Sequence, residues 1–205
     1  MMQKMSIKNC LVNLSAIVAG ALLLVHATIS VAQTALEDIE QAISRETKIV
    51  QVSTEYVLAR DKDADNNTPS ILLFDVREPD EFAVSHLPGA IRLAPDTTAE
   101  AFLRDYGGRL DGITPVFYCS VGRRSNALAE TVAAYSKTHA LSVVPVNLRG
   151  GIFRWHNEAK PLVNEWGTTD QVHPYNWYWR RLLEHRQKSA YQPAEPASAD
   201  EPAPR

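Results

Sequence analysis

One cysteine inside the chain stands in a setting suited to a nucleophile. Cys119 follows the apolar run Val116-Phe117-Tyr118 and precedes Ser120-Val121-Gly122-Arg123-Arg124, after which a helix is expected. A tight strand-to-helix loop turns backbone N–H groups inward as a nest for an anion, and the helix N-terminus adds partial positive charge. Gly122 permits a close approach of the backbone. Together with the two arginines, these features favour the thiolate, which is the nucleophilic form of cysteine.

The other cysteine, Cys10, lies in an N-terminal segment that has the pattern of a secretory signal. Two lysines precede an apolar stretch from Leu11 to Val25, and small residues follow up to Ala32. This stretch is too short and too interrupted for a membrane span of about 20 residues. We therefore predict that residues 1–32 are a cleaved signal peptide and that the protein is exported to the periplasm without a stable membrane span. The alternative is an uncleaved segment that anchors the chain in a membrane.

Composition excludes several classes of protein. The chain has 205 residues, which suits one domain with extensions, and its net charge of -3 lacks the positive excess of a nucleic-acid binder. Two cysteines are too few for tandem zinc sites. The acidic run 61–65 departs from a calcium loop at its sixth and twelfth positions, which are Asn66 and Leu72. We expect no metal, no cofactor and no nucleic acid partner.

The elements that must hold the cysteine loop alternate along the chain between strands and helices. This alternation predicts an α/β domain with a parallel sheet and helices on both faces. Ligands of such sheets bind beyond the carboxyl ends of the strands, where Cys119 stands. Strands are expected at residues 49–52, 71–74, 90–93, 116–118 and 141–146, and helices at residues 35–44, 53–59, 79–84, 98–106, 124–137 and 152–157.

Four motifs follow one another between residues 71 and 163. They are Phe74-Asp75-Val76-Arg77-Glu78-Pro79-Asp80-Glu81-Phe82, Ser85-His86-Leu87-Pro88-Gly89-Ala90-Ile91, the loop Cys119 to Arg124, and Leu148-Arg149-Gly150-Gly151-Ile152-Phe153-Arg154-Trp155. In this order they resemble the motifs of the rhodanese (thiosulfate sulfurtransferase) family, in an exported single-domain form. The resemblance implies a doubly wound, mainly five-stranded sheet and a persulfide carried on the loop cysteine.

The resemblance also implies a chemistry. Cys119 would take sulfane sulfur from thiosulfate or a similar anionic donor and pass it to a thiol or to cyanide. The substrate-binding residues would be Ser120, Val121, Gly122, Arg123 and Arg124. The sequence leaves open which arginine faces the site, and Ser120 and Val121 stand where some relatives carry positive charge, so the donor is also open. The alternative is a rhodanese-fold binding, sensor or sulfur-carrier module that acts with a partner protein.

Loop length separates this chemistry from that of related phosphatases. Sulfurtransferases resemble the present chain in having a six-residue loop, here Cys119 through Arg124. The related phosphatases and arsenate reductases instead place an arginine six residues beyond the cysteine, where this chain has Ser125. The residue before the cysteine is Tyr118 rather than the histidine of those enzymes. The sequence therefore disfavours a phosphatase.

Several residues near the expected site have a structural interpretation as well. Asp75 and Arg77 end a strand and either support the loop or form a buried pair, and the pair is favoured. His86 is expected to bond to backbone in its turn. Trp155 is expected to anchor its helix in the core.

The chain divides into five predicted parts. The stretch 164–186 is rich in aromatic residues and is expected to fold back onto the domain; the alternative is a protein partner site over residues 166–186, since Trp, Tyr and Arg dominate binding hot spots. The last stretch lacks apolar core formers, which predicts disorder. The parts are a signal peptide at 1–32, a helical extension at 33–48, the rhodanese-like domain at 49–163, the aromatic-rich extension at 164–186 and a disordered tail at 187–205.

Overall fold

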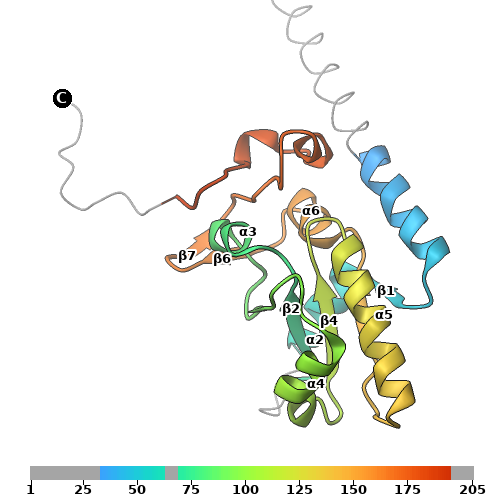
Figure 1. Ribbon diagram of the computed structural model, residues 1–205. Coiled ribbons are helices and arrows are strands. Elements are labelled where there is room, and N and C mark those ends of the chain that lie inside the picture. Colours follow the sequence, from blue (N-terminus) through green and yellow to red (C-terminus); the bar gives the residue numbers. More distant parts are fainter. Residues whose placement is uncertain (1–32, 63–68, 195–205) are drawn as a thin grey trace, which may run out of the picture.

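The computed structural model describes residues 33–62 and 69–194, and its centre is a sheet of five parallel strands (Figure 1). The strand order is β1-β5-β4-β2-β3: the chain starts at the edge strand β1, runs from β2 to the opposite edge at β3, and then returns through β4 to β5 beside β1. This arrangement is the doubly wound α/β fold predicted from the sequence. The strands are β1 (Val50–Val52), β2 (Ile71–Asp75), β3 (Ile91–Arg92), β4 (Thr114–Tyr118) and β5 (Val146–Leu148).

Helices cover both faces of the sheet. The end of strand β4 is a continuous apolar run, because its side chains alternate between two hydrophobic cores and are buried on both faces of the sheet. Phe117 packs on one face with α4 and α5, whereas Val116 and Tyr118 pack on the other face with α2, α6 and the N-terminal helix. The helices are residues 33–46, α2 (Thr54–Lys62), α3 (Pro79–Val84), α4 (Ala99–Tyr106), α5 (Arg123–Thr138) and α6 (Gly151–Asn157).

The strand predicted at residues 141–146 is wrong except for its last residue. The observed strand is β5, which lies between β1 and β4 and pairs with both of them. The strand begins at Val146 because its pairing with both neighbours starts there: Val146 pairs with Val50, the first residue of β1, and with Val116 of β4. Leu141 and Val144 lie outside the sheet, with 45% and 68% of their surface exposed. The other predicted strands and helices are confirmed with small shifts of their ends.

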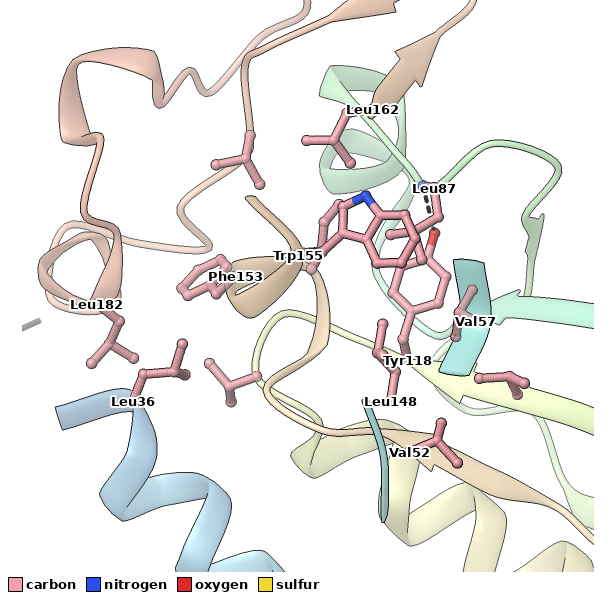
Figure 2. Packing of buried hydrophobic residues seen from close by; sticks show 14 of the residues in the cluster. Leu36, Val52, Val57, Leu87, Tyr118, Leu148, Phe153, Trp155, Leu162 and Leu182 are labelled. Atoms are coloured by element: carbon pink, nitrogen blue, oxygen red, sulfur yellow. Dashed lines mark hydrogen bonds between the residues drawn. The ribbon is translucent and has the colours of Figure 1, made fainter. Parts of the chain in front are cut away.

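The segment after α6 folds back onto the domain, as predicted. It forms a hairpin of β6 (Leu162–Asn164) and β7 (Gly167–Thr169), then two short 3-10 helices, η3 (Trp179–Leu182) and η4 (Arg186–Lys188). Leu182 joins the same core cluster as Leu36, Phe153 and Trp155 (Figure 2). The extension is therefore part of the folded domain rather than an appendage.

The prediction of disorder from residue 187 onward is wrong for its first residues. The N–H of Val172 donates to the carbonyl of Lys188 at 3.0 Å, and the N–H of Ala190 donates to the carbonyl of Val172 at 3.1 Å. Backbone pairing with a distant segment orders this stretch, and composition does not reveal such pairing. Residues 195–205 lie outside the described residues.

Two other predicted features lie outside the described residues, namely the signal segment 1–32 and most of the calcium-like run 61–65. Across 33–62 and 69–194, no helix has the length and apolar character needed to cross a membrane. Over these same residues, no group of three His, Cys, Asp or Glu side chains gathers in a way that could hold a metal ion.

Candidate active site around Cys119

Cys119 lies directly after β4, and only 1% of its surface is exposed. The N–H of Ile152 donates to the carbonyl of Cys119 at 2.9 Å, and the N–H of Phe153 donates to the carbonyl of Ser120 at 3.0 Å. In a trans peptide the N–H points opposite to the C=O. The N–H groups of Ser120 and Val121 therefore point away from α6, and the loop can offer them to an anion.

Two glycines set the shape of this loop. Gly122 has a φ of +90° and precedes the first residue of α5, so the chain turns from the loop into the helix in a conformation that glycine adopts without strain. Gly151 has a φ of +55°, and a Cβ atom there would lie 2.2 Å from the carbonyl oxygen of Cys119. Only glycine at residue 151 lets the start of α6 approach the cysteine so closely.

A buried asparagine on β5 holds the end of the cysteine loop through hydrogen bonds. Asn147 on β5 is fully buried, and its Nδ2 donates to the carbonyl of Gly122 at 3.1 Å and to Gln51 Oε1 at 2.8 Å. The hydroxyl of Ser125 donates to Asn147 Oδ1 at 2.7 Å. Asn147 thus fixes the start of α5 against the sheet. Asn147 was not among the predicted site residues, although a polar amide between the apolar residues Val146 and Leu148 was a usable signal.

A carboxylate that the sequence analysis did not single out also reaches the loop. Glu81 Oε1 accepts a hydrogen bond from the hydroxyl of Ser120 at 2.8 Å, and Arg124 Nη2 donates to Oε1 and Oε2 at 3.0 and 2.8 Å. Glu81 stands at the third position of α3, where its Oε2 also accepts from the N–H of Glu78 at 3.2 Å. This capping box aims the carboxylate at the loop. Glu81 lay within the second half of the first motif, which was the only sequence signal for it.

Electrostatics keep this pair charged. Burial favours a higher pKa for Glu81, but the charge and hydrogen bond of Arg124 outweigh it and lower the pKa below its usual value. Burial likewise favours a lower pKa for Arg124, but the neighbouring Cys119 and Glu81 outweigh it and raise that pKa. The site therefore holds an arginine whose positive charge is matched by a nearly buried carboxylate.

The two arginines of the loop have different positions. Arg124 reaches inward to Glu81 and Ser120, and 30% of its side chain is exposed. Arg123, which begins α5, is exposed to solvent at the rim. This answers the question that the sequence left open: the inward arginine is Arg124.

A cavity of about 160 Å³ opens at the cysteine. Two of its lining residues, Tyr175 and Trp179, come from the C-terminal extension, 56 and 60 residues further along the chain than Cys119. The aromatic residues of this extension predicted that it packs on the domain, but nothing in the sequence indicated that it reaches the site. The full lining comprises Cys119, Ser120, Val121, Arg123, Arg124, Tyr175 and Trp179.

The predicted support residues Asp75 and Arg77 form a separate, fully buried pair. Arg77 Nη2 lies 2.6 Å from Asp75 Oδ2 and donates to the carbonyl of Ser85 at 2.7 Å. Burial favours a lower pKa for Arg77, but the adjacent Asp75 outweighs it and raises that pKa. The pair joins the end of β2 to the turn at Ser85 and makes no hydrogen bond to the cysteine loop, which fits the interpretation as a buried pair.

His86 and Trp155 lie as predicted, and Tyr118 packs in the same core as Trp155. His86 pairs through its backbone with Val163, and its Nδ1 lies 3.0 Å from the carbonyl oxygen of Phe82. Trp155 is 2% exposed, and its indole N–H donates to the carbonyl of Pro161 at 2.8 Å. Tyr118 accepts a hydrogen bond from the N–H of Leu87 in the same core, drawn as a dashed line in Figure 2.

Comparison with known proteins gives one match at the level of a sequence family. The profile of the family described as Rhodanese-like domain matches residues 56–158, about half of the chain. A search of curated proteins finds no match.

Among solved structures, the chain is similar to a thiosulfate sulfurtransferase from Pseudomonas aeruginosa, with 18% identity and a TM-score of 0.48 over 74% of this chain and 26% of that one. It is also similar to a rhodanese-related protein from Thermoplasma volcanium, with 22% identity and a TM-score of 0.43 over 57% of this chain and 99% of that one. A third similar structure is the As-Sb reductase from Leishmania major, with 17% identity and a TM-score of 0.46 over 53% of this chain and 78% of that one.

Proposed function

The chain belongs to the rhodanese-like domain family, and on that premise we propose that it is a sulfurtransferase that carries sulfur as a persulfide on Cys119. The observation that carries the proposal is the setting of this cysteine: it follows a central strand, in a loop whose carbonyls bond to α6 and whose first N–H groups point the other way. Such a nest stabilises an anion, which both the thiolate and the terminal sulfur of a persulfide are.

The proposed reaction is a double displacement. The Cys119 thiolate attacks the outer sulfur of thiosulfate or a similar sulfane donor, a new S–S bond forms, and the S–S bond of the donor breaks with its electron pair leaving on sulfite. An acceptor thiolate or cyanide then attacks the terminal sulfur, and the Cys119 thiolate leaves. No oxidant, reductant or cofactor is consumed in either step.

Each loop residue has a role in this proposal. The N–H groups of Ser120, Val121 and Gly122, with those of the first turn of α5, hold the transferred sulfur, because the first N–H groups of a helix lack partners within it. Arg124 lines the cavity beside Cys119 and, although Glu81 matches much of its charge, adds positive charge near the transferred sulfur. Arg123 at the rim attracts the anionic donor from solvent.

The length of the loop supports sulfur rather than phosphate as cargo. Helix α5 begins at Arg123, so only Ser120, Val121 and Gly122 lie between the cysteine and the helix. The loop thus offers a small cradle, which fits one sulfur atom better than a tetrahedral oxyanion.

The mass of the intact protein after treatment with thiosulfate tests the proposal. We expect a gain of one sulfur atom that cyanide reverses with release of thiocyanate, and we expect Cys119→Ser to show neither gain nor turnover. Retained sulfur transfer by Cys119→Ser would overturn the assignment of the nucleophile. Absence of any gain with several sulfane donors would overturn the sulfurtransferase and favour a binding or carrier module that acts with a partner protein.

Export to the periplasm is a part of the proposal that rests on the sequence alone. The charged start and apolar stretch of residues 1–32 support export to the periplasm. The N-terminal sequence of the protein recovered from a periplasmic fraction tests this, and a start at Gln33 is the expected result. A protein that keeps residues 1–32 and sediments with membranes would instead support the anchored form.

A further inference from the structure

The cavity at Cys119 is larger than a sulfur atom requires. Its volume is about 160 Å³, whereas one water molecule needs roughly 10–15 Å³. The loop holds the reacting sulfur on one side, and the rest of the space faces Tyr175 and Trp179. A substrate with a body beyond its sulfur group therefore fits.

The two residues from the extension give this space an aromatic wall. The ring centroids of Tyr175 and Trp179 lie 6.4 Å apart with an interplanar angle of 78°, an edge-to-face arrangement. The guanidinium carbon of Arg124 lies 5.1 Å from the centroid of the Tyr175 ring. The wall thus stands beside the charged part of the site, where it can receive an apolar group attached to an anionic head.

The backbone at Tyr175 is strained. Its φ is +63°, a conformation that bulky side chains rarely adopt. The N–H of Asn176 donates to the carbonyl of Pro174 at 2.8 Å, so Tyr175 is the central residue of a γ-turn, and its own N–H donates to His173 Nδ1 at 3.0 Å. Such outliers cluster at functional sites, because the surrounding structure must hold them there. Here the positive φ accompanies the placement of the Tyr175 ring in the lining of the cavity at Cys119.

The charge of the site points to a donor with a single negative charge. Arg124 Nη2 donates to both carboxylate oxygens of Glu81 and to the Ser120 hydroxyl, so much of its charge is already matched. The remaining arginine, Arg123, is exposed. Thiosulfate has no apolar body that could pack against the aromatic wall. It also carries two negative charges, which is more than the partly matched positive charge of the site favours.

On the basis of the proposed function, we infer that Tyr175 and Trp179 select organic sulfane donors with an apolar body, of the thiosulfonate class R-SO2-S⁻, over thiosulfate. The Cys119 thiolate bonds to the terminal sulfur, the S–S bond to the sulfonyl sulfur breaks, and its electron pair leaves on the sulfinate R-SO2⁻. The group R packs against the rings of Tyr175 and Trp179. Charge and atoms balance with no further reactant.

Thiocyanate release from three donors by the full chain tests the inference. The donors are benzenethiosulfonate, methanethiosulfonate and thiosulfate, with cyanide as acceptor, and the readout is the ratio of kcat/KM for the first two. These two share one head group, so the ratio reports on the apolar body. We expect Tyr175→Asn and Trp179→Ala each to lower that ratio about three- to tenfold, because each removes a ring that packs against R.

Two design choices keep the result interpretable. Asparagine tolerates a positive φ, so Tyr175→Asn removes the ring without breaking the turn even if Trp179→Ala fails to fold. Trp177→Ala is the matched control: Trp177 is 81% exposed and does not line the cavity, and we expect it to keep the wild-type ratio within about twofold.

The outcomes are distinct. An unchanged ratio in Tyr175→Asn, or an equal loss for both organic donors, would overturn the inference and leave the proposed sulfurtransferase standing. An equal fall of the ratio in Trp177→Ala would also overturn it, because the effect would then not belong to the cavity. No thiocyanate from any of the three donors would overturn the proposed function itself.

Discussion

Two arginine–carboxylate pairs of this chain draw their acids from the same nine-residue motif, 74–82, and yet occupy opposite settings. Asp75 and Arg77 are both fully buried, 2.6 Å apart, and tie β2 to the turn at Ser85. Glu81 pairs with Arg124 at 2.8 Å, at the wall of the cavity, where 30% of the arginine side chain is exposed. The first pair is surrounded by protein, whereas Arg124 of the second pair lines the same cavity as Cys119. The two pairs carry the same charges but differ in solvent access and in the group beside them, which is the Ser85 carbonyl for the first pair and the cysteine loop for the second. These differences, rather than charge, separate a structural pair from one that can influence chemistry.

Breaking the buried pair has the largest expected effect. Arg77→Met removes the cation and leaves Asp75 as an uncompensated charge in the interior, so we expect a loss of about 3–5 kcal/mol in the free energy of unfolding. Denaturant-induced unfolding measures this loss. The double variant Asp75→Asn/Arg77→Met is the control and should recover part of the stability, because no unpaired charge remains. A loss below about 1 kcal/mol for Arg77→Met would contradict the comparison.

Altering the pair at the cavity should change activity more than stability. Glu81→Gln can keep the helix cap by accepting from the N–H of Glu78 with its amide oxygen and can donate from its amide nitrogen to the Ser120 hydroxyl, but it frees the charge of Arg124. We expect the KM for thiosulfate to fall about two- to fivefold, as for one additional unmatched charge near an anion in partly exposed surroundings. Steady-state kinetics with thiosulfate as the varied donor measures this.

The matched control for this variant is Glu78→Gln, which removes a charge from the same turn of the chain without touching Arg124. A similar fall in KM there would mean that general attraction rather than the freed arginine is responsible. A rise of KM in Glu81→Gln would show that Glu81 positions Arg124 for the donor instead of masking it.

The sequence was sufficient for much of the fold because the relevant forces are local. The apolar runs around Phe74 and Phe117 must be buried on both faces, and Pro79 marks the start of α3 where it is found. The candidate site was equally visible in the sequence, since Cys119 and Gly122 belong to one short loop. The predicted strand at 141–146 failed because the extent of β5 is set by its pairing with β1 and β4, which the local sequence does not specify.

The rest of the candidate site could not be predicted because it forms only through tertiary contacts. Glu81 meets Ser120 across 39 positions of sequence. Tyr175 reaches Arg124 only after the extension has crossed the domain. Charge, aromatic character and turn propensity were all visible at these positions, but none of them specifies a partner so far along the chain.

The smallest expected effect concerns the pH dependence of stability, and it isolates the pair at the cavity. Pairing with Arg124 holds the pKa of Glu81 below the value of about 4.5 that it has in the unfolded chain. The pair's contribution is therefore fully present above about pH 4.5 and is lost as the pH falls through the lower pKa of the folded state. Arg77 does not titrate in this range, so the buried pair's cation stays charged. Between about pH 5 and pH 3 we expect Glu81→Gln to lose less unfolding free energy than the wild type, by under about 1 kcal/mol. Asp105→Asn, which removes an exposed carboxylate 2.9 Å from Arg104, should keep the wild-type slope, because exposed pairs contribute little. Parallel slopes for Glu81→Gln and the wild type would mean that Arg124 does not stabilise the Glu81 carboxylate in the folded protein, and the contrast between the two pairs would then rest on burial alone.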